Sequence, residues 1–293
     1  MIEHYSVLHR EVAEFMKNLK EGFFIDATVG GGGHSYLILK QNPNVKLIGI
    51  DKDDYALNVA QEKLKDFEGR FWLVKSSFKD IDKVVEKFNV KPVVGVLFDF
   101  GVSHFQLKLP RGFSFQREEP LDMRMDTSSS LTAYEVVNFY PEHHLLKILT
   151  DYGEEKFAKR IVKSIVDYRR KKRIETTKEL ADIVYKSYPP NLRHSRIHPA
   201  TKTFQAIRIE VNNELKEIEE GLEKAINITD KEGLILAISF HSLEDRIVKN
   251  TFKKYKELKF LEILTKKPIT PKEDEIEENP ASRSAKMRVA RRI

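Results

Sequence analysis

Short apolar runs alternate with amphipathic stretches over the first hundred residues of the chain. Four runs have the length and composition of strands, namely Phe23–Ala27, Val45–Ile50, Phe71–Lys75 and Val93–Phe98. Helical patterns of the length that a crossover needs occupy Tyr55–Lys65 and Ile81–Phe88. This alternation predicts a parallel sheet with helices on both faces. The fourth run is almost wholly apolar, which is typical of a central parallel strand.

The rhythm changes after Gly101, and the next hundred residues carry no strong strand signal. Helical patterns dominate there, at Ala133–Phe139, Glu142–Asp151, Glu155–Tyr168 and Thr177–Tyr188. An amphipathic helix then places Leu215 and Ile226 on one face, and a fifth apolar strand follows at Gly233–Phe240. We therefore predict one α/β domain, residues 1–107 and 208–293, interrupted by an all-α insertion at residues 108–207. The acidic segment from Pro268 to Pro280 is predicted to be a mobile loop.

Composition narrows the class of protein. The chain has 293 residues, 41% of them hydrophobic, and no cysteine. It contains neither an apolar run of about 18 residues nor an N-terminal signal pattern, so we expect a cytoplasmic protein without a membrane partner. The absence of cysteine excludes disulfides, thiolate catalysis and cysteine-based metal sites. Two pairs of histidines are close in sequence, His143 with His144 and His194 with His198. Since neither pair has a third ligand at recognisable spacing, no metal site is predicted.

Positive charge is concentrated rather than spread evenly. The net charge is +6, and the tail from Ala281 to Ile293 contains lysine and arginine but no acidic residue. The run Arg169–Arg173 adds a second basic stretch inside the helical region. A basic run is often only a solvated face, but this distribution also fits a surface that meets a polyanion such as RNA.

Four consecutive glycines, Gly30 to Gly33, follow the first predicted strand and lead into a helix at His34. Glycine permits positive φ and lets a ligand approach the main chain, while the amides at a helix N-terminus face that ligand. The second strand delivers Asp51 about 20 residues later, the spacing at which a carboxylate binds ribose hydroxyls. The glycine loop and Asp51 together predict a nucleoside-cofactor site.

The glycine spacing favours one cofactor over another. The dinucleotide pattern Gly-x-Gly-x-x-Gly/Ala fails here, because its last position falls on Ser35 or Tyr36. The phosphate loop with Gly-Lys-Ser/Thr fails as well, since His34 follows Gly33. S-adenosylmethionine has no phosphate and fits better. A dinucleotide enzyme and a plain turn in a non-binding α/β protein stay open on spacing alone. Further polar or aromatic residues end the strands, at Asp26, Phe78 and Asp99.

Motifs along nearly the whole chain resemble those of the bacterial MraW/RsmH methyltransferases. They occur in order at His4–Leu8, Asp26–Ser35, Asp99–Ser103 with Gln106, Arg111–Phe115, Pro120–Asp126, His198–Ile209, Ser239–Arg246 and Asn279–Lys286. Three positions depart from the family pattern, Ser6, Phe100 and His104. Any one of these motifs is weak evidence for the family, but their combination in this order is highly specific to it.

The resemblance implies a class I (Rossmann-like) methyltransferase fold, with a seven-stranded, mostly parallel sheet whose antiparallel last strand would be Ala285–Arg291. It implies methylation of the N4 exocyclic amine of a cytosine in the decoding centre of 16S ribosomal RNA, with S-adenosylmethionine as cofactor and S-adenosylhomocysteine as product. The expected partner is 16S rRNA or the small ribosomal subunit, with no obligatory protein partner. The implied cofactor-binding residues are Gly32, Gly33, His34, Asp51, Phe78, Asp99 and Gln106.

Catalysis must overcome the delocalised lone pair of the cytosine amine, and a hydrogen-bond acceptor beside that nitrogen would favour attack. Asp99 is the first candidate for the acceptor and Ser103 the second. RNA is read mostly where it is single-stranded, by phosphate contacts and aromatic stacking. Candidates for that surface are Arg111, Phe113, Arg124, Arg193, Arg196, His198, Lys202 and Arg208. The alternatives are a nicotinamide-dependent Rossmann oxidoreductase and a non-catalytic RNA-binding α/β module.

Overall fold

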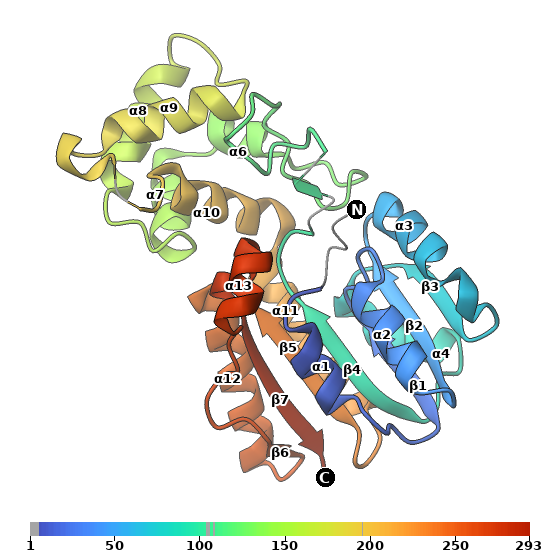
Figure 1. Cartoon of the computed structure of the whole chain (residues 1–293). Coiled ribbons are helices and arrows are strands. Elements are labelled where there is room, and N and C mark those ends of the chain that lie inside the picture. Colours follow the sequence, from blue (N-terminus) through green and yellow to red (C-terminus); the bar gives the residue numbers. More distant parts are fainter. Residues whose placement is uncertain (1–5, 104–105, 108, 195) are drawn as a thin grey trace. The chain divides into compact units, whose positions relative to one another are not determined.

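The computed structural model describes residues 6–103, 106–107, 109–194 and 196–293. The chain divides into two compact units, which we call the α/β unit (residues 1–101 and 215–293) and the helical unit (residues 102–214) (Figure 1). The helical unit is thus somewhat larger than the predicted insertion. Its last helix, α10 (Ala200–Asn212), runs without a break across the predicted boundary at residue 207. His104 and the first residues of the N-terminal motif lie outside the described residues.

The α/β unit is built on a seven-stranded sheet of order β3-β2-β1-β4-β5-β7-β6 (Figure 1). Its strands are β1 (Gly22–Asp26), β2 (Val45–Asp51), β3 (Phe71–Lys75), β4 (Val93–Asp99), β5 (Leu234–Ser239), β6 (Leu261–Ile263) and β7 (Lys286–Arg292). β1 to β5 pair in parallel, whereas β7 is antiparallel to both β5 and β6. This arrangement confirms the predicted fold class, including the antiparallel last strand.

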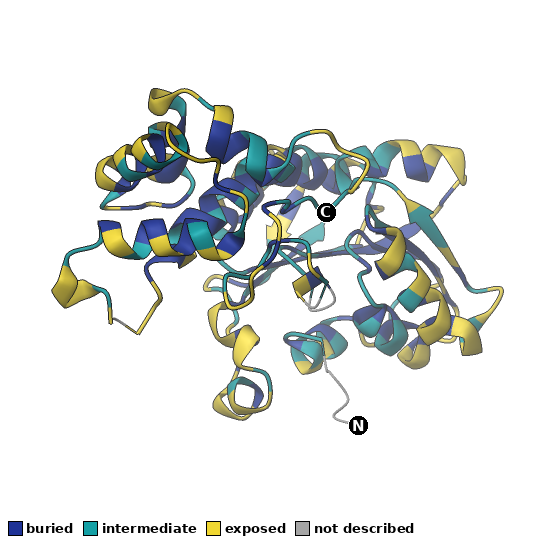
Figure 2. Cartoon of the chain, turned by 90° about the horizontal axis from the view of Figure 1, so that it is seen from above, coloured by how far each residue is buried: buried dark blue, intermediate teal, exposed yellow. Residues whose placement is uncertain are grey.

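Apolar side chains cover both faces of the sheet, as near-continuous apolar strands require. The helices of this unit are α1 (His9–Phe15), α2 (Gly33–Gln41), α3 (Asp54–Leu64), α4 (Ile81–Lys87), α11 (Glu214–Ile228), α12 (Ser242–Glu257) and α13 (Glu273–Glu278). Helices α1, α2 and α3 pack over one face, around Phe24 and Leu47. Helices α4, α11 and α12 pack over the other, around Ile25 and Phe98. Figure 2 shows the buried strands in dark blue and the exposed helix surfaces in yellow.

The strand register brings the polar strand ends to one edge of the sheet. Asp26 at the end of β1 lies opposite Gly49, and Asp51 at the end of β2 lies opposite Lys75. Asp99 ends the central strand β4. Ligands of open parallel sheets bind at this carboxyl edge. The fold therefore gathers the predicted acidic residues where a ligand site is expected.

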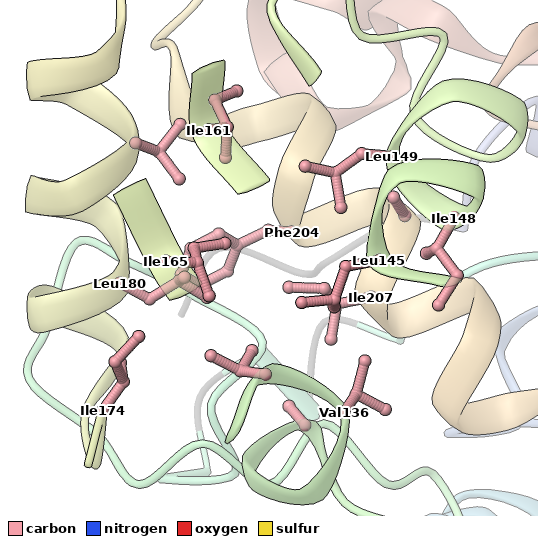
Figure 3. Close-up of a cluster of buried hydrophobic side chains, with 14 of the residues drawn as sticks. Val136, Leu145, Ile148, Leu149, Ile161, Ile165, Ile174, Leu180, Phe204 and Ile207 are labelled. Atoms are coloured by element: carbon pink, nitrogen blue, oxygen red, sulfur yellow. The ribbon is translucent and has the colours of Figure 1, made fainter. Parts of the chain in front are cut away.

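The helical unit has an apolar core of its own (Figure 3). Its helices are α6 (Ala133–Phe139), α7 (Glu142–Asp151), α8 (Ala158–Arg169), α9 (Thr177–Ser187) and α10. Leu145, Ile161, Ile165 and Phe204 meet in that core from three of these helices. The helical patterns read from the sequence therefore correspond to real helices, each within a few residues of its predicted bounds.

Two C-terminal segments differ from expectation. The acidic segment predicted to be a mobile loop forms helix α13 instead. It is held there because Glu275 accepts a 2.6 Å hydrogen bond from the backbone N–H of Leu8, and Asp274 pairs with Arg10. Strand β6 was not predicted, since a strand of three residues has too little pattern to recognise.

Among the described residues, no helix combines the length and the apolar character needed to cross a membrane.

Candidate functional site

The glycine loop turns sharply from β1 into α2. Gly30 and Gly32 have φ of +49° and +78°, in the left-handed region that glycine enters without strain. Gly32 also packs closely on α3, where a Cβ would lie 3.3 Å from the Cα of Ala60. Gly33 begins α2, and a Cβ there would collide with the hydroxyl of Ser6. The backbone therefore favours glycine at Gly30 and Gly32, and the first amides of α2 lie at the carboxyl edge of the sheet.

Asp51 ties this loop to the end of β2. Its Oδ2 accepts a 3.0 Å hydrogen bond from the N–H of Gly30, and its Oδ1 accepts one of 2.9 Å from the N–H of Asp53. Burial raises the pKa of the Asp51 carboxyl, and these two hydrogen bonds oppose that rise. The backbone of Lys52 acts on this carboxyl in the same direction. An ionised carboxylate has about four lone-pair sites, so Asp51 can still accept from a further donor such as a ribose hydroxyl.

Asp26 is the most deeply buried acid of the site, with 2% of its surface exposed. Ser35 Oγ donates a 2.6 Å hydrogen bond to Asp26 Oδ2, and the N–H of Thr28 donates one of 3.3 Å to Oδ1. Loss of hydration raises the pKa of Asp26 to about 6, although Ser35 and His34 act in the opposite direction. Asp26 therefore titrates close to neutral pH.

His34 and Asp99 approach each other across the edge of the sheet. His34 Nε2 lies 3.6 Å from Asp99 Oδ2, and the His34 side chain is 6% exposed. Neither ring nitrogen of His34 has a hydrogen-bond partner among the described residues, nor does Asp99 Oδ1. The backbone of Asp99 is fixed, because its N–H donates a 2.7 Å hydrogen bond to Thr28 Oγ1. Since buried polar atoms are nearly always paired, these are the atoms to which a bound ligand would supply partners.

Phe78 follows β3 and is held from three sides. Its ring lies 5.7 Å from that of Phe98 and 5.8 Å from that of Phe100, measured between centroids. On the third side it meets Gly221 of α11, where a Cβ would lie 2.7 Å from Phe78 Cδ2. This packing gives the ring one fixed orientation at the edge of the sheet, as an aromatic platform for a base requires.

A buried glutamate on the same helix fastens the loops around Phe78. Glu217 accepts a 3.1 Å hydrogen bond from Ser77 Oγ and lies 3.2 Å from Lys79 Nζ. Lys52, which follows β2, pairs with the same carboxylate. Neither Glu217 nor Gly221 was predicted as a site residue, because both are remote in sequence from the loops that they contact.

We expect Gly221→Ala to weaken the binding of S-adenosylhomocysteine about tenfold. The added methyl must displace the Phe78 ring, and overpacking of this kind costs typically about 1–3 kcal/mol. Helix propensity would offset up to about 1 kcal/mol of that cost to folding, so binding should suffer more than stability. Calorimetry and thermal unfolding measure the two effects separately. In a Phe78→Leu background the second substitution should have little further effect; an undiminished effect there would show that the ring is not its cause.

Ser103 and Gln106 belong to the helical unit and pair with each other. The N–H of Ser103 donates a 3.0 Å hydrogen bond to Gln106 Oε1, and the N–H of Gln106 donates one of 3.2 Å to Ser103 Oγ. The structure thus groups Gly32, Gly33, His34, Asp51, Phe78 and Asp99 in one unit and these two residues in the other.

Most residues predicted to contact RNA already have partners inside the helical unit. Arg124 donates two hydrogen bonds of 2.8 Å to the Asp122 carboxylate, and Arg208 donates two of 2.8 and 2.9 Å to the Glu214 carboxylate. Lys202 donates to the carbonyl of Glu154 at 3.0 Å. These contacts stabilise the unit itself, so the three side chains are less available to a ligand than the sequence suggested.

Most of the other predicted RNA-contacting residues also have partners, and one is exposed. Arg193 donates to the carbonyls of Tyr188 and Lys186, and the His198 ring stacks on Phe115 at 4.7 Å. Phe113 packs against the apolar core of the unit, and Arg111 takes part in an interaction as well. Arg196 is exposed. Most of the predicted RNA-binding residues therefore take part in the packing of the helical unit itself.

Curated relatives match the chain along its whole length. The ribosomal RNA small subunit methyltransferase H of Sulfurihydrogenibium azorense is 84% identical over 293 residues, which are 100% of both chains. The protein of the same name from Persephonella marina is 67% identical with the same coverage. Among solved structures, a putative rRNA methylase from Clostridium thermocellum aligns with 99% of this chain and 100% of its own, at 12% identity and a TM-score of 0.47.

A family model extends this likeness to a class of proteins. The model of the MraW methylase family matches residues 1–293. The match confirms the resemblance drawn from the ordered motifs and the predicted cofactor, S-adenosylmethionine. It gives no support to the alternative of a nicotinamide-dependent oxidoreductase. The chain belongs to the MraW methylase family.

Proposed function

We propose that this protein methylates the N4 exocyclic amine of a cytosine in the decoding region of the small-subunit ribosomal RNA. The relatives named above are ribosomal RNA small subunit methyltransferases, which supports the RNA as substrate. The proposal of an amine as acceptor rests on Asp99. This carboxylate ends the central strand, has an oxygen without a partner among the described residues, and can accept a hydrogen bond from an amino group.

The residues at the sheet edge fit S-adenosylmethionine. We assign the ribose hydroxyls to Asp51, which keeps unused lone pairs, and one face of the adenine to Phe78. The glycine loop would admit the ligand close to the main chain, and no lysine stands there for a phosphate. His34 would donate to or accept from a polar group of the ligand, because both of its ring nitrogens lack hydrogen-bond partners within the described part of the chain. Gln106 stays a predicted cofactor contact.

S-adenosylmethionine supplies an electrophilic methyl group on a positively charged sulfur. The task of the protein is to hold the cytosine amine in line with that group, which can contribute several orders of magnitude in rate. We assign to Asp99 the hydrogen bond from one amine hydrogen, which localises the nitrogen lone pair as the N–C bond forms. The surplus proton of the nitrogen then passes to Asp99 or to water. The proton leaves only after attack.

His34 would keep Asp99 in position. At 3.6 Å it lies just beyond hydrogen-bond distance of Asp99 Oδ2, and a small movement on ligand binding would close the contact. A hydrogen bond from His34 to one carboxylate oxygen would leave Oδ1 free for the amine. His34 is thus proposed as a positioning residue in addition to a cofactor contact.

Two measurements test this function. Calorimetry should detect binding of S-adenosylhomocysteine and none of NAD; the reverse result would restore the oxidoreductase alternative. Incubation with isotope-labelled S-adenosylmethionine and unmodified small subunits, or naked rRNA in parallel, should place the label on N4-methylcytidine after nuclease digestion. Label on adenosine or on protein would overturn the substrate assignment. Cofactor binding without any transfer would favour a non-catalytic RNA-binding module.

A further inference from the structure

Helix α8 of the helical unit has one apolar face and one strongly basic face. Ile161 and Ile165 are buried in the core of the unit (Figure 3). Exposed lysines and arginines lie on its outward side and just beyond its two ends: Lys156, Lys159, Arg160, Lys163 and Arg170. Asp167 is the one acid that shares this face in the described part of α8, and it pairs with Arg170 at 3.3 Å. We call these five cations the α8 basic face.

Four of the five cations of the α8 basic face have no ion-pair partner among the described residues; the fifth, Arg170, pairs with Asp167. Nearby, Lys147 of α7 pairs with Asp151, and Lys172, in the turn after α8, pairs with Glu179 of α9. Among the described residues, no ion-pair partner faces Lys156, Lys159, Arg160 or Lys163. A merely solvated helix face usually alternates both signs of charge at i,i+4 spacing. Four uncompensated cations in a row instead create a local field that attracts a polyanion.

The spacing of the cations suits an extended polyanion. Positions three or four apart on a helix are separated by about 4.5–6 Å along its axis, since each residue rises about 1.5 Å. The row begins beside a hollow of about 430 Å³ between α7 and α8, whose lining includes Lys156, Lys159, Arg160, Leu146 and Thr150. Glu155 in the same lining is already engaged, because it accepts a 2.6 Å hydrogen bond from the Tyr188 hydroxyl. Cations therefore dominate the free charge at the hollow.

An exposed aromatic residue lies at the opposite end of α8. Phe139, the last residue of α6, is 56% exposed, and the Arg173 guanidinium lies 4.7 Å from its ring centroid. Arg169 of α8 donates to the carbonyls of Val137 and Tyr140 on either side of Phe139, at 2.7 Å each, which fixes this corner. A rigid aromatic–arginine pair open to solvent is the kind of platform on which an unstacked base is held.

We propose that the α8 basic face binds the sugar-phosphate backbone of single-stranded RNA, and that Phe139 with Arg173 stacks on one of its bases. This inference rests on the proposed function and names the surface that would hold the RNA substrate. It differs from the motif residues Arg124, Lys202 and Arg208, whose charged groups are used inside the unit. Unpaired cations and an exposed ring are the groups that remain available to a polyanion with bases.

The first test removes charge from the face. Lys156→Gln, Arg160→Gln and Lys163→Gln are combined, and the matched control combines Lys249→Gln, Lys253→Gln and Lys256→Gln, which have the same spacing on α12 of the other unit. Anisotropy of a labelled single-stranded rRNA fragment is measured over a range of salt concentrations. The α8 variant should bind about tenfold to a hundredfold more weakly at low salt, with the slope of log K against log salt shallower by about 2. The control should retain most of the affinity and slope.

The second test removes the aromatic ring. Phe139→Ala should weaken RNA binding roughly tenfold and leave the salt slope unchanged, since stacking releases no counterions. Phe139→Tyr keeps an aromatic face and should restore binding. A loss of affinity in the tyrosine variant equal to that in the alanine variant would contradict a stacking role.

The outcomes separate this inference from the proposed function. If the wild-type protein binds S-adenosylhomocysteine but neither binds nor methylates RNA, the proposed function fails. If the wild type binds RNA and the α8 variant binds it equally well, or the control loses as much, only the α8 basic face is overturned. Calorimetry with S-adenosylhomocysteine on each variant checks that the α/β unit is intact, since none of the substitutions touches its cofactor site.

Discussion

Asp99→Asn is expected to lower the rate of methyl transfer about a hundredfold to a thousandfold, the usual cost of losing one electrostatic contact to a reacting group. The amide has nearly the same shape as the carboxylate, so β4 and its hydrogen bond to Thr28 should remain. What changes is the acceptor, which loses its negative charge. Single-turnover transfer to unmodified small subunits measures the rate, and calorimetry with S-adenosylhomocysteine measures cofactor binding, which should weaken about tenfold or less.

Asp51→Asn is the matched comparison for that result. Asp51 accepts hydrogen bonds from the N–H of Gly30 in the glycine loop and from the N–H of Asp53 at the start of α3, so its loss should act chiefly on cofactor binding. We therefore expect Asp99→Asn to lose methyl transfer and keep most of its cofactor affinity. Asp51→Asn should chiefly lose cofactor affinity. An Asp99→Asn variant that transfers methyl groups at the wild-type rate, or that no longer binds S-adenosylhomocysteine, would refute the role of Asp99 as the amine acceptor.

Asp26→Asn is expected to stabilise the α/β unit at neutral pH. The pKa of Asp26 is raised to about 6 from an ordinary value of 3.8, so between these values the folded state binds more protons than the unfolded state. The stability that the protonated Asp26 contributes is fully present below pH 4 and is lost as the pH rises through 6. A difference of two pKa units corresponds to a loss of about 3 kcal/mol in the free energy of unfolding. Asparagine stays neutral, and the Ser35 hydroxyl can reverse from donor to acceptor to keep its hydrogen bond.

Urea unfolding at several pH values measures this effect, with the fluorescence of Trp72 as reporter. Trp72 is the one tryptophan of the chain and lies on β3 of the same unit. The variant should gain stability over the wild type as the pH rises from 4 to 7. Asp80→Asn is the control of opposite sign, because Lys83 lowers the pKa of Asp80 and the variant should therefore lose stability at neutral pH. A difference between Asp26→Asn and wild type that does not change with pH would contradict the assignment.

Long apolar strands and amphipathic helices were predictable, because burial on a sheet face or in a helical core imposes a period on the sequence. The glycine loop was predictable for a related reason: positive φ and close backbone approach favour glycine at Gly30 and Gly32. Asp51 and Asp99 were predictable because strand ends of a parallel sheet converge on one edge.

Other features depend on contacts between distant segments and leave no local signal. Glu217 and Gly221 lie on a helix that reads as an ordinary amphipathic one, and only the packed structure reveals their contacts with Ser77 and Phe78. Helix α13 forms where composition predicted disorder, because Leu8 and Arg10 from the other end of the chain bind it. The charged motif residues could not be sorted into structural and binding roles, since a sequence does not show that Arg208 has Glu214 as its partner.

The connectivity of the sheet has a consequence for how the protein is made. The apolar strand β4 pairs on one side with β1, which precedes it, and on the other with β5, which follows the entire helical unit. On the ribosome, β4 therefore emerges with one edge open, and it stays open until the helical unit has been synthesised. An unpaired apolar edge is the form most prone to join another chain. The helical unit has a core of its own and can fold during this interval, so a chain that stops after it would combine a folded unit with an aggregation-prone half sheet.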